Sequence, residues 1–261
     1  MKLLCKLSAF GQRLGLAVAL GFSVWCGDAR GESIYEVPEV ANEVVGAWDV
    51  NILADDVHFA HASVLRQVRM RLAIAGVQTC KLWIFDGLNR DPLHTVVFTN
   101  QPATNQFHTS TYDFNMQVQV PKDIYVGFSA QGGGWGGTAS DYWSWGIVAN
   151  RGVAGTVGEY YYGPVSGGRL TTVFSTGNGA LGCLQVLSEP VRIESVALAT
   201  GQVQLAIGML PIHATNTVMR GAAIDGASWE EEEILPLGVS NHVWSATNAG
   251  APRAFYRIST R

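Results

Sequence analysis

Apolar and polar residues alternate with a period of two along most of the chain, and this pattern predicts β-strands. The clearest run extends from Tyr112 to Val120, where every second residue is apolar and the residues between are Asp, Asn or Gln. The run from Val68 to Ile74 repeats the pattern, with Arg69 and Arg71 at polar positions. Because successive side chains of a strand point to opposite faces, each run predicts a strand with one buried and one solvated face.

Further strands are predicted where short apolar stretches lie between groups of turn-forming residues. In the first part of the chain these stretches cover residues 79–85, 95–99, 123–129, 142–149 and 182–187. No window of helical length shows an apolar stripe with a period of 3.6 residues. Eight or more antiparallel strands within about 150 residues predict a double-sheet sandwich of the jelly-roll kind.

A second unit is predicted to begin at residue 189, beside Pro190. Its short strands are expected at residues 191–198, 202–207, 215–220, 242–246 and 253–259. About six strands in roughly 70 residues favour a small fibronectin-like sandwich. The four acids Glu230–Glu233 are interpreted as a solvated loop between strands. The predicted fold is therefore all-β, with a jelly-roll-like sandwich over residues 30–188 and a small fibronectin-like β-sandwich over residues 189–261.

The N-terminal residues have the pattern of an export signal. Lys2, Lys6 and Arg13 precede an apolar run from Leu14 to Trp25, and the small residues around Ala29 follow it. A basic start, about a dozen apolar residues and a small-residue exit are typical of a secretory signal peptide, here residues 1–29. The run is shorter than the ~20 apolar residues that span a membrane. We expect a secreted or extracytoplasmic protein with no membrane span in its mature chain.

Composition and charge narrow the range of partners. The chain of 261 residues has a formal net charge of −4, and 15% of its residues are charged. A nucleic-acid-binding protein usually carries a basic footprint, which this composition does not provide. We therefore expect no nucleic-acid partner.

Two cysteines, Cys80 and Cys183, lie beyond the predicted signal. Disulfides form in exported proteins. A bond between these two cysteines would close a long loop and stabilise the folded protein by about 4 kcal/mol in the chain-entropy model. Alternatively, both are buried free thiols that pack as small apolar side chains. Both alternatives stay open, because spacing alone does not show whether the two Cα atoms meet.

The sequence holds three fragments of known catalytic or metal-binding patterns, and each is incomplete. Ser129 lacks the second glycine of the nucleophile elbow of serine hydrolases, and no helix follows it. His58 and His61 lie near Asp55 and Asp56 but without further ligands at a useful spacing for a metal, and these polar residues are interpreted as a loop between strands. The oxygen-bearing residues of the segment Asp86–Asp91 do not have the spacing of an EF-hand and are ordinary turn formers. We expect no catalytic residue, no metal site and no cofactor.

An aromatic stretch between residues 135 and 162 is the best candidate for ligand binding. Flat rings stack on sugar rings while nearby polar groups bond the hydroxyls, and Tyr and Trp provide large contact areas with few rotors to freeze. Trp143 and Trp145 would share one face of a strand, and core packing is the favoured interpretation of that pair. The candidate ligand-binding residues are Trp135, Asp141, Tyr142, Glu159 and Tyr161.

The C-terminal region resembles a known module. Four of its segments are similar to a small β-sandwich that closes many exported proteins of planctomycete and verrucomicrobial type. These segments are Ile193–Leu198, Val203–Leu205, the Ser-Trp pair ending at Trp229, and Phe255–Ile258 (FYRI). The preceding domain, with VPKDIYVGF at residues 120–128, resembles jelly-roll domains of exoproteins of the PEP-CTERM kind. The sorting signal of that family is not found, so its anchoring is not implied. The resemblance implies an accessory surface or secreted protein, without a particular activity.

Three functions follow from these features. We expect a secreted, non-catalytic binding or adhesion protein, directed through exposed aromatics at a polysaccharide or another cell-surface ligand. The first alternative is a polysaccharide-active enzyme on the same sandwich, for which Asp141 and Glu159 are the candidate acids. The second is a purely structural envelope protein. Sandwich folds host all three classes, so the fold does not decide between them.

Overall fold

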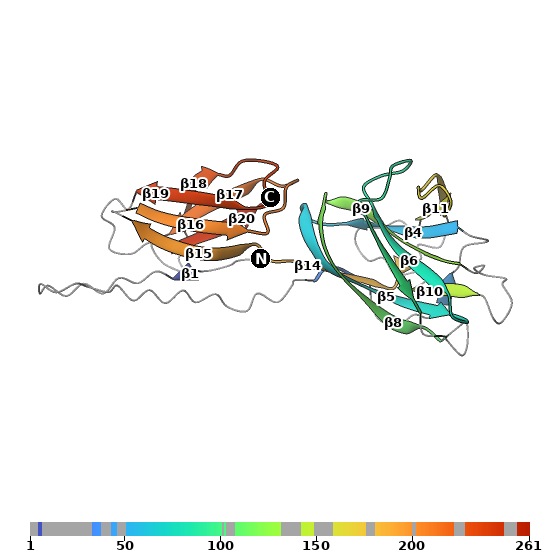
Figure 1. Ribbon diagram of the computed structural model, residues 1–261. Coiled ribbons are helices and arrows are strands. Elements are labelled where there is room, and N and C mark those ends of the chain that lie inside the picture. The colour runs from blue at the N-terminus through green and yellow to red at the C-terminus, as the bar shows by residue number, and fades with distance from the viewer. Residues whose placement is uncertain are drawn as a thin grey trace, which may run out of the picture. The chain divides into compact units, whose positions relative to one another are not determined.

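The computed structural model describes residues 5–6, 33–37, 43–45, 51–100, 102, 108–131, 142–148, 159–175, 181–199, 202–221, 228–247 and 255–261. All regular elements in these residues are β-strands (Figure 1), which confirms the all-β prediction. No helix in these ranges is long and apolar enough to cross a membrane.

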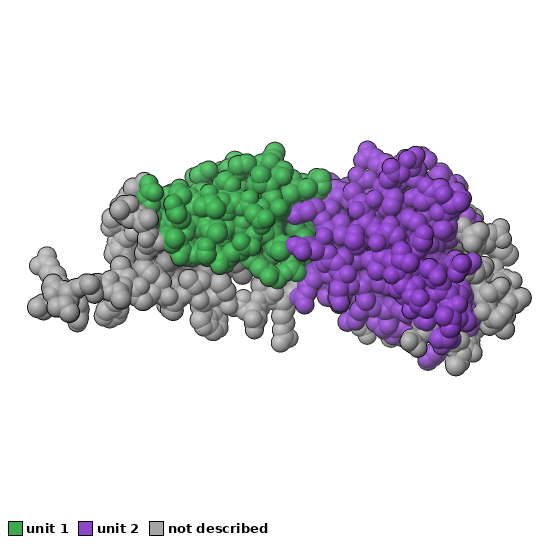
Figure 2. Space-filling model, in the orientation of Figure 1, with its two compact units in different colours: residues 1–32, 61–64, 189–261 green, residues 33–60, 65–188 purple. Residues whose placement is uncertain are grey.

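The chain divides into two compact units, which Figure 2 shows in different colours. Unit 2 contains residues 33–60 and 65–188, and unit 1 contains residues 189–261 together with 61–64 and 1–32. The change of unit between Ser188 and Glu189 coincides with the change in strand pattern along the sequence.

Unit 2 contains two antiparallel sheets. The six-stranded sheet has the order β12 (Thr172–Ser175), β11 (Glu159–Pro164), β4 (Asn51–His58), β9 (Asp123–Ala130), β6 (Thr79–Phe85), β7 (His94–Thr99). The seven-stranded sheet has the order β13 (Leu181–Gly182), β10 (Trp143–Val148), β5 (Ser63–Ile74), β14 (Leu184–Ser188), β2 (Ser33–Glu36), with β3 (Glu43–Val45) paired to β10 and β8 (Ser110–Val120) paired to β5. From β4 to β6 and again from β8 to β11, the chain alternates between the two sheets.

The main core of unit 2 draws its side chains from both sheets. Leu53 and Phe128 come from the six-stranded sheet, and Met70 and Trp143 come from the seven-stranded sheet, all fully buried. The ring of Phe128 meets that of Trp143 edge-to-face, with centroids 5.0 Å apart. The alternating runs along β5 and β8 turn one row of side chains into this core and the other row outward. The architecture is that of a β-sandwich.

Unit 1 contains two smaller sheets. One has the order β15 (Arg192–Ala199), β16 (Gln202–Gly208), β19 (His242–Thr247), and the other has the order β1 (Cys5–Lys6), β20 (Phe255–Thr260), β17 (Asn216–Gly221), β18 (Trp229–Ile234). Leu205 and Trp244 from the first sheet pack with Val218 and Tyr256 from the second. Each sheet thus buries one face in a common core.

Two segments interpreted as loops are strands. Glu230–Glu233 lie in β18, where Glu230 pairs with Arg220 of β17. Asp55 and His58, placed in a loop because of their polarity, lie in β4 and pair with β9. In both segments the backbone partner comes from elsewhere in the sheet, and local polarity does not reveal it.

Candidate functional site

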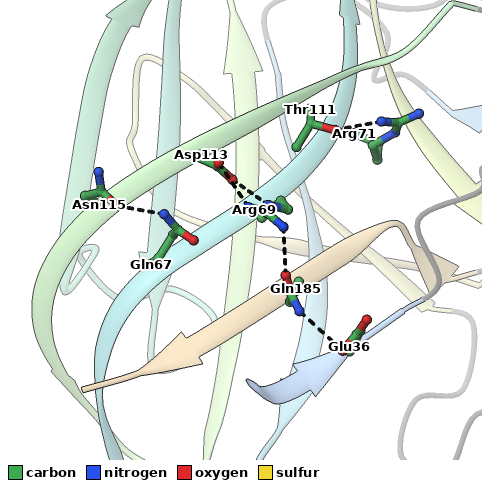
Figure 3. A network of polar contacts seen from close by, with 8 residues as sticks. All are labelled: Glu36, Gln67, Arg69, Arg71, Thr111, Asp113, Asn115 and Gln185. Carbon is green, nitrogen blue, oxygen red and sulfur yellow. Dashed lines mark hydrogen bonds and ion pairs between the residues drawn. The ribbon is translucent and has the colours of Figure 1, made fainter. Parts of the chain in front are cut away.

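A network of polar side chains covers one face of four neighbouring strands of unit 2, namely β8, β5, β14 and β2 (Figure 3). Along β5, Val68 and Met70 are fully buried in the core. Because side chains alternate between faces, Gln67, Arg69 and Arg71 project from the opposite face. We call this surface the polar sheet face.

The central row of the polar sheet face crosses all four strands. Arg69 Nε donates to Asp113 Oδ1 at 2.6 Å, and its Nη2 donates to Asp113 Oδ2 at 3.2 Å. Arg69 Nη1 donates to Gln185 Oε1 at 3.3 Å, and Gln185 Nε2 donates to Glu36 Oε2 at 3.3 Å. The bidentate contact between guanidinium and carboxylate is the strongest interaction of the row. The side chains of Arg69 and Asp113 remain 33% and 42% exposed.

Two shorter contacts flank the central row, and both join β5 to β8. Arg71 Nη1 donates to Thr111 Oγ1 at 2.6 Å, and Gln67 Nε2 donates to Asn115 Oδ1 at 2.8 Å. Amide, hydroxyl, guanidinium and carboxylate groups therefore lie side by side on one surface, where the residues of β8 and Glu36 are exposed and those of β5 and Gln185 are half-buried. These groups donate to and accept from hydroxyls, so the polar sheet face is suited to a hydroxyl-bearing ligand.

The structure describes only part of the predicted aromatic site. Tyr142 and Tyr161 are each 7% exposed, so neither offers an open ring for stacking. Tyr161 packs edge-to-face on Tyr125, with centroids 4.6 Å apart. Trp135 and Asp141 lie outside the described residues, as does the side chain of Glu159, whose backbone begins β11.

The core interpretation of the tryptophan pair is confirmed. Trp143 and Trp145 are fully buried, and both belong to the main core of unit 2. Trp145 Nε1 donates to the carbonyl oxygen of Cys183 at 3.3 Å. These two rings are therefore structural.

His58 lies between two carboxylates at the end of β4. Its Nδ1 is 2.9 Å from Asp123 Oδ1, and its Nε2 is 2.9 Å from Asp56 Oδ2. The hydrogen bond to Asp123 is the main reason that the pKa of His58 is raised, and Asp56 adds to the effect. Because its ring nitrogens face the carboxylates of Asp123 and Asp56, His58 links β4 to β9. Among the described residues, no group of three His, Cys, Asp or Glu side chains has an arrangement that could hold a metal ion.

Asp55 is a fully buried carboxyl group on the core side of β4. Its Oδ2 accepts the backbone N–H of Gly182 at 2.8 Å, which links β4 to β13 of the other sheet. Its Oδ1 is buried without a hydrogen-bond partner among the described groups. Burial raises the pKa of Asp55 well above its ordinary value, and the charge of Asp56 adds to the rise. Burial between the sheets therefore favours the protonated form of this carboxyl.

The other chemical fragments have structural partners. Ser129 is buried, and its Oγ accepts the indole N–H of Trp83 at 2.8 Å. Asp86 pairs with Arg90 at 3.1 Å, and the carboxylate of Asp91 is 2.7 Å from Nη2 of Arg169, far along the chain. The two carboxylates of this turn thus bind arginines.

Both cysteines are buried free thiols. Cys80 lies in β6 of one sheet, and Cys183 lies between β13 and β14 of the other. Burial raises the pKa of Cys80 to about 12 and that of Cys183 to about 11. The structure therefore has two buried free thiols at Cys80 and Cys183, not a disulfide between them.

The residues of the C-terminal motif have packing roles in unit 1. The guanidinium of Arg257 lies over the ring of Trp229, 4.4 Å from its centroid. Tyr256 packs against Trp244, with ring centroids 5.2 Å apart. The Arg257–Trp229 contact thus links β20 to β18 across β17, and the Tyr256–Trp244 contact joins the two sheets.

Comparison with known proteins does not assign the chain to a family. No family model matches it, and no curated protein does. A solved structure of a β-D-glucuronidase from Dictyoglomus thermophilum is similar at 7% identity, covering 100% of this chain and 42% of that enzyme. The TM-score of 0.21 is too low to support an argument about fold or activity.

The polar sheet face was not predicted as a site. Its signal in the sequence is the polar half of two alternating runs, residues 68–74 and 112–120. Each run alone predicts only an ordinary strand with one solvated face. Only the strand order brings Gln185 and Glu36 beside them.

Proposed function

We propose that this is an exported, non-catalytic binding or adhesion protein that recognises carbohydrate. The observation that carries the proposal is the polar sheet face, where Arg69, Asp113 and Gln185 present hydrogen-bonding groups on a partly exposed surface. Sugar hydroxyls both donate and accept hydrogen bonds, and such a mixed surface complements them. Export is supported by the pattern of residues 1–29, and the resemblance of the C-terminal region to modules of exported proteins is consistent with it.

A binding screen tests this proposal. The purified exported protein is incubated with a panel of insoluble polysaccharides and with soluble ones in affinity gels, and released reducing sugar is assayed in the same tubes. Retention without sugar release supports the proposal. Sugar release establishes the polysaccharide-active enzyme instead. Absence of both retention and release on every polymer refutes recognition of carbohydrate and leaves the structural role.

The Trp135→Ala variant is tested in the same screen, because the aromatic stretch is the other candidate surface. Loss of retention in this variant assigns binding to the stretch around Trp135. Unchanged retention directs attention to the polar sheet face.

A further inference from the structure

We infer that the polar sheet face is the ligand-binding surface of this protein and that its ligand is an uncharged, hydroxyl-rich glycan chain lying across β8, β5, β14 and β2. This inference rests on the proposed function and adds the location of the site and the chemical class of the ligand.

The charged groups of the face compensate one another. Arg69 is held by both carboxylate oxygens of Asp113, and Glu36 accepts from Gln185 at the other end of the row. Arg71, the second cation, is bound to the hydroxyl of Thr111. The face thus carries two cationic and two anionic side chains. An anionic polymer would have to compete with Asp113 for Arg69, whereas a neutral polymer carries no charge that the two carboxylates of the face could repel.

Gln185 is the most weakly held member of the row. Both of its contacts are 3.3 Å long, at the far end of the hydrogen-bond range, whereas Arg69 approaches Asp113 to 2.6 Å. A sugar hydroxyl can replace either contact of Gln185 without separating the ion pair. The central amide can therefore turn its donor and acceptor toward a ligand while its neighbours stay in place.

The row has a direction and a length suited to a chain. Direct register between strands places Arg69 opposite Gln185 and Gln185 opposite Glu36. Three strand-to-strand spacings measure about 14 Å, which is enough for a short oligosaccharide segment. The flanking pairs Arg71–Thr111 and Gln67–Asn115 widen this track along the strands.

The test compares Gln185→Ala with a matched control, Gln202→Ala, which removes an exposed glutamine from β16 of unit 1. Affinity gels contain a neutral polymer (a β-1,3-glucan, xylan or mannan) or an anionic one (alginate or polygalacturonate). For a neutral polymer that the wild-type protein binds, Gln185→Ala is expected to weaken affinity about threefold to tenfold, the value of a net hydrogen bond. Gln202→Ala should leave it unchanged. Asn115→Ala, which removes one member of the flanking pair Gln67–Asn115, should also weaken affinity for that polymer. Circular dichroism verifies that all three variants fold.

The outcomes separate this inference from the proposed function. Failure of the wild-type protein to bind any polymer refutes both. Binding that Gln185→Ala and Asn115→Ala leave unchanged keeps the function but refutes the location of the site. Preference for the anionic polymers overturns the ligand class. Binding of neutral polymers that both variants weaken, and the control does not, supports the inference.

Discussion

Asp55 is a carboxyl group in the interior of unit 2, and its replacement by asparagine should change how stability depends on pH. The carboxyl is fully buried between β4 and Gly182 of β13. Burial raises its pKa well above the ordinary value, the negative charge of Asp56 raises it further, and the N–H of Gly182 opposes the rise. Over a range of pH, the folded protein therefore binds a proton that the unfolded chain has lost.

The sign and size of the effect follow from that difference. Stability due to protonated Asp55 is fully present below the unfolded pKa of about 4 and is lost as the pH rises toward the folded pKa. Within that window the free energy of unfolding should fall by about 1.4 kcal/mol for each pH unit. Asparagine has nearly the same volume and an oxygen for the N–H of Gly182, but it has no proton to lose. The Asp55→Asn variant should therefore lack this slope.

Urea unfolding of both proteins between pH 4.5 and 7 measures the effect, with the two units fitted as separate transitions. The difference in unfolding free energy between variant and wild type should grow in favour of the variant as the pH rises. His58→Gln serves as a comparison. Because the pKa of His58 is raised, its contribution is present below the unfolded value of about 6.5 and is lost only above it. A difference between Asp55→Asn and wild type that does not change with pH would refute a protonated Asp55 in the folded state.

Two further predictions concern the core. Gly182→Ala should lower the unfolding free energy of unit 2, measured by urea unfolding, by about 1–3 kcal/mol, because the added Cβ would lie 2.5 Å from the ring of Trp145. In the same urea experiment Gly87→Ala should behave as wild type, since its Cβ meets only the flexible side chain of Arg90 at 3.2 Å. Cys80 and Cys183 should not react with a thiol reagent in the folded protein at pH 8 and should both react in denaturant, because burial holds their pKa values at about 12 and about 11. Rapid labelling of either thiol in the folded protein would contradict their burial.

Strands with one buried and one solvated face were predictable from the sequence. The run at 68–74 lies within β5, and the run at 112–120 lies within β8. The period-two signal fails where both faces of a strand have the same environment. In β4, Ile52 and Ala54 pack in a second apolar cluster on the face opposite the main core, so the strand shows no alternation. In β18 the opposite holds, because positions 230–234 are all exposed.

The candidate site depends on contacts that a sequence pattern does not contain. Arg69 meets a carboxylate 44 positions away and an amide 116 positions away, so the network requires the strand order. The burial of Tyr161 likewise depends on Leu170, which joins the same apolar cluster from the turn after β11. Residue type predicted the chemistry available on the strands, but only the sheet topology brings the groups together.

The four glutamates of β18 have a consequence for self-association. In the described part of unit 1, β18 is the last strand of its sheet, paired on one side with β17. A free strand edge is a template for pairing with another chain, and like charges placed opposite each other disfavour that pairing. A second β18 approaching this edge would bring its own Glu230–Glu233 against the same four charges. The residues that conceal the strand in the sequence therefore also keep its edge from joining two copies of the protein into one continuous sheet.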